Sequence, residues 1–194
     1  MKIIHVVLSD VFAGIEQHVE ELSLIQEKDC DITIICNESI ASKFSIKNIV
    51  SIENFNRRSL IGLFKLYSKV KSIKPDIIHT HGSKATIVIN RIKGFLKVKH
   101  VASLHGIKNN ISMYKKADRI IAVSNLAKKS LNTECAVVKN WWSPSLPDQI
   151  EHENQYALAV GRLEKVKGFD LLIQSWVGVE NNLVIVGSGN EKGN

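Results

Sequence analysis

Short apolar runs alternate with amphipathic stretches along most of this sequence. The amphipathic stretches, 15–25, 58–74 and 83–96, place apolar residues at helical spacing. The apolar runs are nearly continuous, which indicates strands buried on both faces of a parallel sheet. These runs are 3–8, 31–36, 48–52, 76–80, 98–103, 119–124 and 135–138. The repeated β-α-β order predicts an α/β fold, a doubly wound, Rossmann-like parallel sheet with helices on both faces.

The helical period also predicts which side chains of the first two helices face the core. In 15–25 these are Ile15, Val19, Leu22 and Ile25. In 58–74 they are Leu60, Leu63, Phe64, Tyr67, Val70 and Ile73. The outward face of 58–74 is rich in lysine, so we expect that face to meet solvent or an anionic partner.

The strand and helix rhythm is interrupted near residue 140. The segment 140–155 contains two adjacent tryptophans and two of the 3 prolines, a composition typical of a linker. New strands are expected at 156–160 and 182–187, with a helix between them. We predict a first domain over 1–139, a linker over 140–155, and over 156–194 the first β-α-β unit of an incomplete second Rossmann-like domain.

The charge distribution narrows the classes of partner. The chain has 26 Lys and Arg against 19 Asp and Glu, and most of the basic residues lie between 43 and 119. No nucleic-acid-binding motif or row of stacking aromatics accompanies them, which excludes nucleic acid as the expected partner. An anionic membrane surface is not excluded as a partner. No apolar run is long enough to span a bilayer, and the first residues resemble a strand more than a signal peptide. We expect a cytoplasmic protein that contacts the membrane at most peripherally.

The cysteines and histidines do not predict a metal site. The 3 cysteines have no C-x-x-C spacing, and no histidine spacing demands an ion. We therefore expect no metal and no resident cofactor. His79 is expected to be buried in a strand, whereas His81 and His105 fall just past strand ends, each before a glycine. Either could contact a hydroxyl or a phosphate of a ligand.

In doubly wound sheets, ligands bind at the carboxyl ends of the strands. The loops to examine are therefore 9–14, 80–85, 104–109 and 123–128. Gly14 lies where the first loop enters the first helix, and its missing side chain would let a ligand approach the helix closely. An ordinary turn glycine is an equally good interpretation of this position.

A second candidate site follows the strand expected at 156–160. Gly161 and Gly168 enclose Arg162 and Lys167, and guanidinium and ammonium groups beside a helix start suit a diphosphate. A solvated basic turn fits the spacing equally well. The loop with Gly187 and Gly189 departs from the dinucleotide-binding fingerprint, and the sequence contains no P-loop.

Several motifs together resemble one family. They are FAGIEQHVEEL, PDIIHTHGSKA, VASLHG, ADRIIAVSNLAKKSL and VVKN in the first domain, then ALAVGRLEKVKGFDLLIQSW and LVIVGSG. The sequence is similar to the retaining "group 1" glycosyltransferases of the GT-B fold, which are typical of bacterial envelope polysaccharide and lipooligosaccharide assembly. The resemblance implies transfer of a sugar from a nucleotide-sugar donor to a cell-envelope glycan or glycolipid acceptor.

The resemblance also implies a role for individual residues. Arg162 and Lys167 would hold the donor diphosphate, and Gly14 would lie under the same phosphates. His105 would be the catalytic histidine that contacts the transferred sugar, and His81 would lie nearer the acceptor. Gly187 and Gly189 would line the nucleotide pocket.

The sequence departs from the family pattern in places. Ala13 replaces the first of two paired glycines, and Lys139 replaces a proline. The family's pair of donor-binding glutamates and its final helix have no counterpart. The resemblance therefore implies an acceptor-side domain followed by a truncated donor-side domain. The alternative is a non-catalytic domain that binds a glycan or anionic lipid, or that partners a separate C-terminal half.

Overall fold

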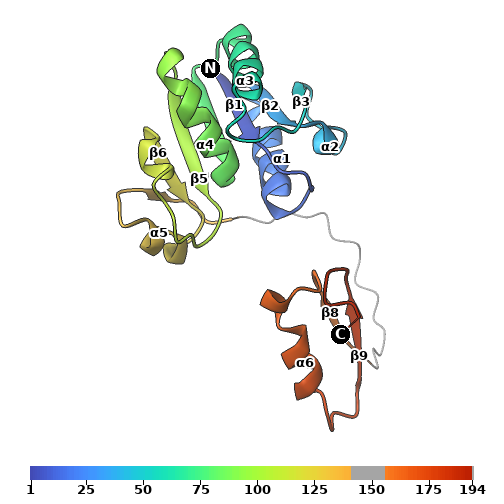
Figure 1. Ribbon diagram of the computed structural model, residues 1–194. Helices are drawn as coiled ribbons and strands as arrows, with labels where there is room; N and C mark the ends of the chain where they lie inside the picture. Colours follow the sequence, from blue (N-terminus) through green and yellow to red (C-terminus); the bar gives the residue numbers. More distant parts are fainter. Residues whose placement is uncertain (141–155, 194) are drawn as a thin grey trace. The chain divides into compact units, whose positions relative to one another are not determined.

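The computed structural model describes residues 1–140 and 156–193, and the chain divides into two compact units, Met1–Trp142 and Ser143–Asn194 (Figure 1). Apart from Asn140, the predicted linker lies outside the described residues. None of the helices within the described residues has the length and apolar character needed to cross a bilayer.

The first unit is built on a seven-stranded parallel sheet, as far as it is described. Its strands are β1 (Lys2–Val7), β2 (Asp31–Asn37), β3 (Ile49–Ile52), β4 (Ile77–His81), β5 (Lys99–Leu104), β6 (Arg119–Ala122) and β7 (Ala136–Val137). They lie in the order β3-β2-β1-β4-β5-β6-β7. The strand order reverses between β1 and β4, and the register there pairs His5 with His79 and Val7 with His81. This confirms the predicted fold class and places the topological switch point at β1 and β4.

Helices cover both faces of this sheet. They are α1 (Gly14–Gln26), α2 (Glu38–Ala41), α3 (Leu60–Ile73), α4 (Gly82–Ile92) and α5 (Asn125–Leu131), with 3₁₀ turns η1 (Lys93–Phe95) and η2 (Tyr114–Lys116). Because alternate strand residues point to opposite faces, Ile4 and Val6 of β1 lie in the core with residues of α3 and α4. Ile3 and Val7 lie in the core with Val19 of α1.

The buried faces of α1 and α3 match the prediction in part. Val19 and Val70 are buried as predicted, and other predicted residues are partly buried against the core, namely Ile15, Leu63, Tyr67 and Ile73. In α1 the buried residues are Glu16, Val19, Glu20 and Ser23, and in α3 they are Gly62, Leu66 and Val70. Ile25, Leu60 and Phe64 are 54%, 81% and 69% exposed. Buried carboxylates are tolerated in α1 because they accept hydrogen bonds. For example, Glu20 Oε1 accepts from the backbone N–H of Ser45 at 2.7 Å.

The second unit is a single β-α-β arrangement. Parallel strands β8 (Tyr156–Val160) and β9 (Asn182–Val186) are joined through a 3₁₀ turn, η3 (Lys165–Lys167), and helix α6 (Phe169–Ser175). These strands lie at the positions that the sequence predicts. Among residues 156–193 none is fully buried, and Leu171 and Ile173 remain 64% and 53% exposed.

Candidate functional site

Five histidines gather at the switch point of the first unit. His5 comes from β1, and His79 and His81 come from β4. Alternate strand residues share a face, so these three rings lie on the side of the sheet that α1 covers. His18 of α1 and His105, which follows β5, complete the group.

Three hydrogen bonds connect part of this group in single file, a feature we call the histidine row (Gln26, His5, His81 and His105). Gln26 Oε1 lies 2.8 Å from His5 Nε2. His5 Nδ1 lies 3.0 Å from His81 Nε2, and His81 Nδ1 lies 3.1 Å from His105 Nε2. His79 stands beside the row rather than in it, because its Nε2 bonds Ser103 Oγ at 2.8 Å. Its ring centroid lies 4.2 Å from that of His81.

Burial keeps these imidazoles neutral. Loss of hydration, and to a smaller extent neighbouring His18, lowers the pKa of His5 and of His105 to about 4. At His5 the hydrogen bond to Gln26 opposes this lowering of the pKa. Burial and the surrounding histidines also hold the pKa values of His79 and His81 well below the usual range. At neutral pH the group therefore offers hydrogen-bond donors and acceptors rather than positive charge.

The structure places the three histidines singled out in the sequence at different depths. His79 is buried, as predicted. His81, expected at the rim, is only 2% exposed, and both its ring nitrogens bond other histidines. His105 is half-buried at the end of the row. Thus His105 is the member of this pair with surface accessible to a ligand.

The histidines also form two groups with metal-binding potential among the described residues. One contains His5, His79 and His81 and the other contains His18, His81 and His105, with ligand atoms within 4.8 Å of one another. Neutral imidazoles suit an ion such as Zn²⁺. Several of these nitrogens already bond each other, however, so an ion would have to break the histidine row. The absence of a metal stays a prediction.

Gly14 is the first residue of α1, and a Cβ atom added there would meet nothing within 4 Å. The space that the sequence analysis expects for a ligand is therefore open. A carboxylate is already present at this helix end. Glu16 Oε2 accepts from the Ala13 N–H at 2.9 Å, and Glu16 Oε1 accepts from the Ser9 hydroxyl at 2.5 Å. A phosphate near Gly14 would experience both the helix dipole and this negative charge.

A polar network that the sequence analysis missed lies in the loops of the same sheet edge. Asp10 Oδ1 accepts from Asn37 Nδ2 at 2.9 Å and from Asn54 Nδ2 at 2.8 Å, while Lys84 Nζ donates to Asn54 Oδ1 at 2.6 Å. Asn37 is 1% exposed, and its Oδ1 is buried with no hydrogen-bond partner among the described residues. The signal was available, because Asp10 and Asn54 follow strands and Asn37 ends one.

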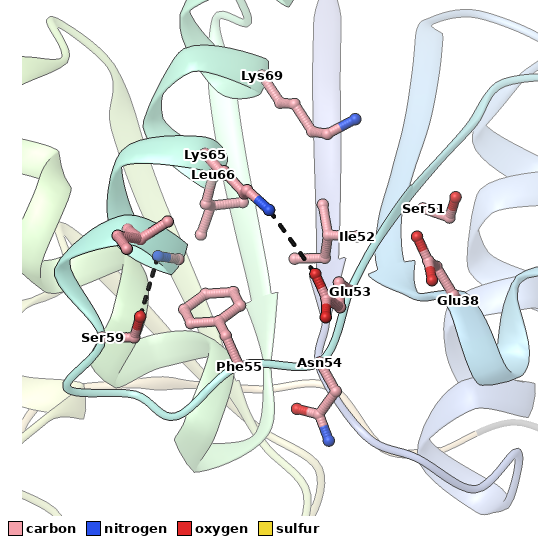
Figure 2. Close-up of a pocket in the computed structure, with 12 residues that line it drawn as sticks. Glu38, Ser51, Ile52, Glu53, Asn54, Phe55, Ser59, Lys65, Leu66 and Lys69 are labelled. Carbon is pink, nitrogen blue, oxygen red and sulfur yellow. Dashed lines mark hydrogen bonds and ion pairs between the residues drawn. The ribbon is translucent and has the colours of Figure 1, made fainter.

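A neighbouring pocket of about 480 Å³ lies between α3 and the segment after β3. Figure 2 shows Lys65 and Lys69 extending from α3, with Glu53 and Glu38 facing them from the other side. Lys65 Nζ and Glu53 Oε2 are 3.7 Å apart, and Phe55 packs against α3 beside Gly62. The pocket therefore combines both signs of charge with an apolar wall.

In the second unit, Arg162 and Lys167 share one short connection. Arg162 Nη1 forms an ion pair of 2.8 Å with Glu164 Oε1, and its side chain is 69% exposed. Lys167 ends η3, and Gly168 follows with a left-handed φ of 67° before α6. A side chain would be strained at Gly168, which explains glycine at this position.

Gly187 and Gly189 have a packing role within this unit. A Cβ atom at Gly187 would collide with the carbonyl oxygen of Gly161, and one at Gly189 would collide with that of Leu163. The two loops therefore lie in direct contact through their backbone atoms. Their glycines are explained by close approach, and the predicted contact with a nucleotide stays a prediction.

A family model recognises most of the first unit, from just before α1 to its last described residue, including His18, His79, His81 and His105. The model for Glycosyltransferase Family 4 matches residues 12–140, more than half of the chain. The chain belongs to glycosyltransferase family 4. The resemblance to a glycosyltransferase family is confirmed at this level.

Two relatives of this family 4 chain give further context. An uncharacterized glycosyltransferase of Methanocaldococcus jannaschii is 27% identical over an alignment of 199 positions, gaps included, and the alignment covers 91% of this chain and 56% of that protein. The UDP-Gal:alpha-D-GlcNAc-diphosphoundecaprenol alpha-1,3-galactosyltransferase of Escherichia coli is 32% identical over 123 residues, covering 55% and 30% respectively. The chain spans about half the length of the first relative and less than a third of the second.

Solved structures share the fold. Anabaena Alr3699/HepE in complex with UDP superposes with a TM-score of 0.75 at 16% identity, covering 97% of this chain and 61% of that one. The lipopolysaccharide outer core galactosyltransferase WaaB, in its apo form, gives a TM-score of 0.69 at 20% identity, with 98% and 62% covered. WaaB is a galactosyltransferase by its name, and the likeness to both structures supports the predicted GT-B type of fold.

Proposed function

We propose that this family 4 chain takes part in transferring a sugar from a nucleotide-sugar donor to a hydroxyl of a cell-envelope glycan or glycolipid. The observation that carries the proposal is the family match over residues 12–140, which include Gly14 and His105. The Escherichia coli relative acts on a diphosphoundecaprenol acceptor by its name, which supports a lipid-linked acceptor.

Arg162 and Lys167 are proposed to bind the donor diphosphate. Both come from one short connection, and an exposed guanidinium can make two parallel hydrogen bonds to phosphate oxygens. Glu164 now occupies one side of that guanidinium. Positive charge at the leaving diphosphate stabilises it as the glycosidic bond breaks. The HepE structures, which contain UDP or UDP-glucose, support a nucleotide as the ligand class.

His105 is proposed to contact the transferred sugar, with His81 behind it. A neutral imidazole suits a sugar hydroxyl, because it can accept or donate a hydrogen bond without carrying charge. The acceptor is proposed to lie over the network of Asp10, Asn37 and Asn54. Carboxylate and amide groups are suited to several hydroxyls at once, because together they supply both acceptors and donors.

Peripheral contact with an anionic membrane is proposed at the α3–η1 patch (Leu60, Phe64, Phe95 and Arg91). These residues line one shallow pocket of about 370 Å³. Phe64 and Phe95 are 69% and 78% exposed, unusual for aromatic side chains. Basic residues are frequent on the same segments, 57–74 and 91–97, and each near an anionic surface contributes about 1 kcal/mol.

Calorimetric titration of the 194-residue chain with UDP, GDP and ADP tests the proposal, followed by transfer from the matching nucleotide sugar to a lipid-diphosphate sugar. We expect one nucleotide to bind and the Arg162→Ala variant to bind it at least tenfold more weakly. Binding without transfer would favour the alternative, a non-catalytic binding domain or a split-enzyme partner. Failure of all three nucleotides to bind would contradict a donor site in this chain.

A further inference from the structure

The histidine row has a defined chemical polarity. A neutral imidazole carries one N–H, so it can donate one hydrogen bond and accept one through its two nitrogens. Burial holds the pKa values of His5, His81 and His105 below the usual range, so all three rings are neutral near pH 7.5. Whichever nitrogen is protonated in one ring thus decides the tautomer of the next.

Gln26 sets the direction. It presents its carbonyl oxygen Oε1 to His5 Nε2, and an amide oxygen can only accept. His5 therefore carries its proton on Nε2 and has a bare Nδ1. That nitrogen accepts from the Nε2–H of His81, whose own Nδ1 accepts from the Nε2–H of His105.

We propose that Gln26 is a positioning residue that fixes His105 as its Nε2–H tautomer through His5 and His81, leaving Nδ1 of His105 as a hydrogen-bond acceptor. Gln26 is the last residue of α1 and acts across two intervening rings. His79 directs its Nε2 away from the row, to Ser103 Oγ at 2.8 Å.

The fixed tautomer selects the chemistry of the ligand group that meets His105. An acceptor nitrogen requires a donor, so the partner is a hydroxyl rather than a phosphate or carbonyl oxygen. In this last step the inference rests on the proposed function, since it makes the partner a hydroxyl of the transferred sugar. A donor analogue in which that hydroxyl is replaced by hydrogen should bind at least tenfold more weakly, because Nδ1 would be left unpaired.

The tautomers are measured directly by NMR on the full chain, labelled with ¹⁵N at the histidine rings, at pH 7.5. The His105 signals are assigned with a His105→Gln variant. We expect protonated Nε2 and bare Nδ1 in His5, His81 and His105. A proton on Nδ1 of His105 or His81 in the unaltered protein would overturn the proposal without any variant.

Two substitutions test the role of Gln26. Gln26→Glu keeps an acceptor and should preserve the Nε2–H form of His105. Gln26→Lys offers only donors, so it should reverse the row and move the His105 proton to Nδ1. Gln17→Lys, at an exposed position of the same helix, is the control and should change nothing. A folded Gln26→Lys protein with an unchanged His105 tautomer would overturn the proposal.

The tautomer readout needs neither donor nor activity, so the two proposals can fail separately. Expected tautomers with no nucleotide binding or transfer would contradict the proposed function and leave the role of Gln26 standing. Normal transfer with a different His105 tautomer would contradict the role of Gln26 and leave the proposed function standing.

Discussion

The backbone N–H of Leu163 donates a hydrogen bond of 2.8 Å to the carbonyl oxygen of Ser188. This bond joins the loop after β8 to the loop after β9, and a second joins the Gly161 N–H to the Val186 carbonyl at 3.0 Å. The loop that holds Arg162 is therefore positioned by the glycine loop beside it. The absence of a Cβ atom at Gly187 is what allows this approach.

The first prediction is that Gly187→Ala separates these loops. The added methyl collides with the Gly161 carbonyl, so the hydrogen bonds around it must lengthen, at a cost of about 1–3 kcal/mol. Hydrogen exchange at the Gly161 and Leu163 amides should accelerate at least fivefold. Gly193→Ala is the matched control, because nothing lies within 4 Å of its added Cβ. Equal exchange in the two variants would refute the packing role.

The second prediction separates the charge of Arg162 from its ion pair. Arg162→Ala should weaken nucleotide diphosphate binding at least tenfold, because hydrogen bonds to charged groups are worth about 1.5–3 kcal/mol each. Glu164→Gln should preserve or tighten binding, because it removes the competing carboxylate 2.8 Å from Nη1. Calorimetry measures both.

The control for these variants is Arg119→Ala, which removes an arginine at the amino end of β6 in the first unit. It should leave the affinity unchanged. Loss of binding in Glu164→Gln as large as in Arg162→Ala would show that the ion pair positions the loop and that Arg162 does not contact phosphate.

The strands were predictable because burial on both faces makes each one a nearly continuous apolar run. The buried faces of the helices were less predictable. Glu16 and Glu20 disrupt the apolar stripe of α1, yet they are buried because backbone and hydroxyl groups donate to them. The four-residue α2 is too short for a helical period to be seen.

The candidate site was predictable only where one rule sufficed. Strand ends direct attention to His81 and His105, because carboxyl ends of parallel strands share an edge. The pairing of His5 with Gln26 joins residues 21 positions apart and depends on where the last turn of α1 packs. Sequence pattern gives no access to that distance, nor to the burial that removes His81 from the rim.

The third prediction concerns acid stability. The pKa of His5 and of His100 is lowered to about 4, mainly by burial. His18 contributes to the lowering at His5, and at His100 Lys93 contributes to it while Asp118 opposes it. Between pH 6.5 and pH 4 these histidines bind protons in the unfolded chain but not in the folded chain. The free energy of unfolding should therefore be highest above pH 6.5 and fall with decreasing pH, by roughly 1.4 kcal/mol per pH unit for each ring.

Urea unfolding at pH 7.5, 6.5, 5.5 and 5.0 measures this slope above the range where carboxylates dominate. His100→Gln should reduce the slope by about one proton, because Thr80 can still bond a polar side chain there. A stability that stays constant from pH 7.5 to pH 5.0 would contradict the neutral, buried state of these rings.

The fourth prediction tests the α3–η1 patch. Phe64→Ser should weaken binding to phosphatidylglycerol-containing vesicles about tenfold, because burying a phenylalanine side chain is worth about 1.5–3 kcal/mol. Phe64 is 69% exposed, so the folded chain should keep its stability. Leu126→Ser on α5, at a residue of similar exposure outside the patch, is the control in the same cosedimentation assay.

Raising the salt concentration should release the protein, because basic residues of 57–74 and 91–97 supply the attraction to anionic headgroups. Equal binding to neutral and anionic vesicles, or an equal loss in both variants, would contradict a specific membrane contact at this patch.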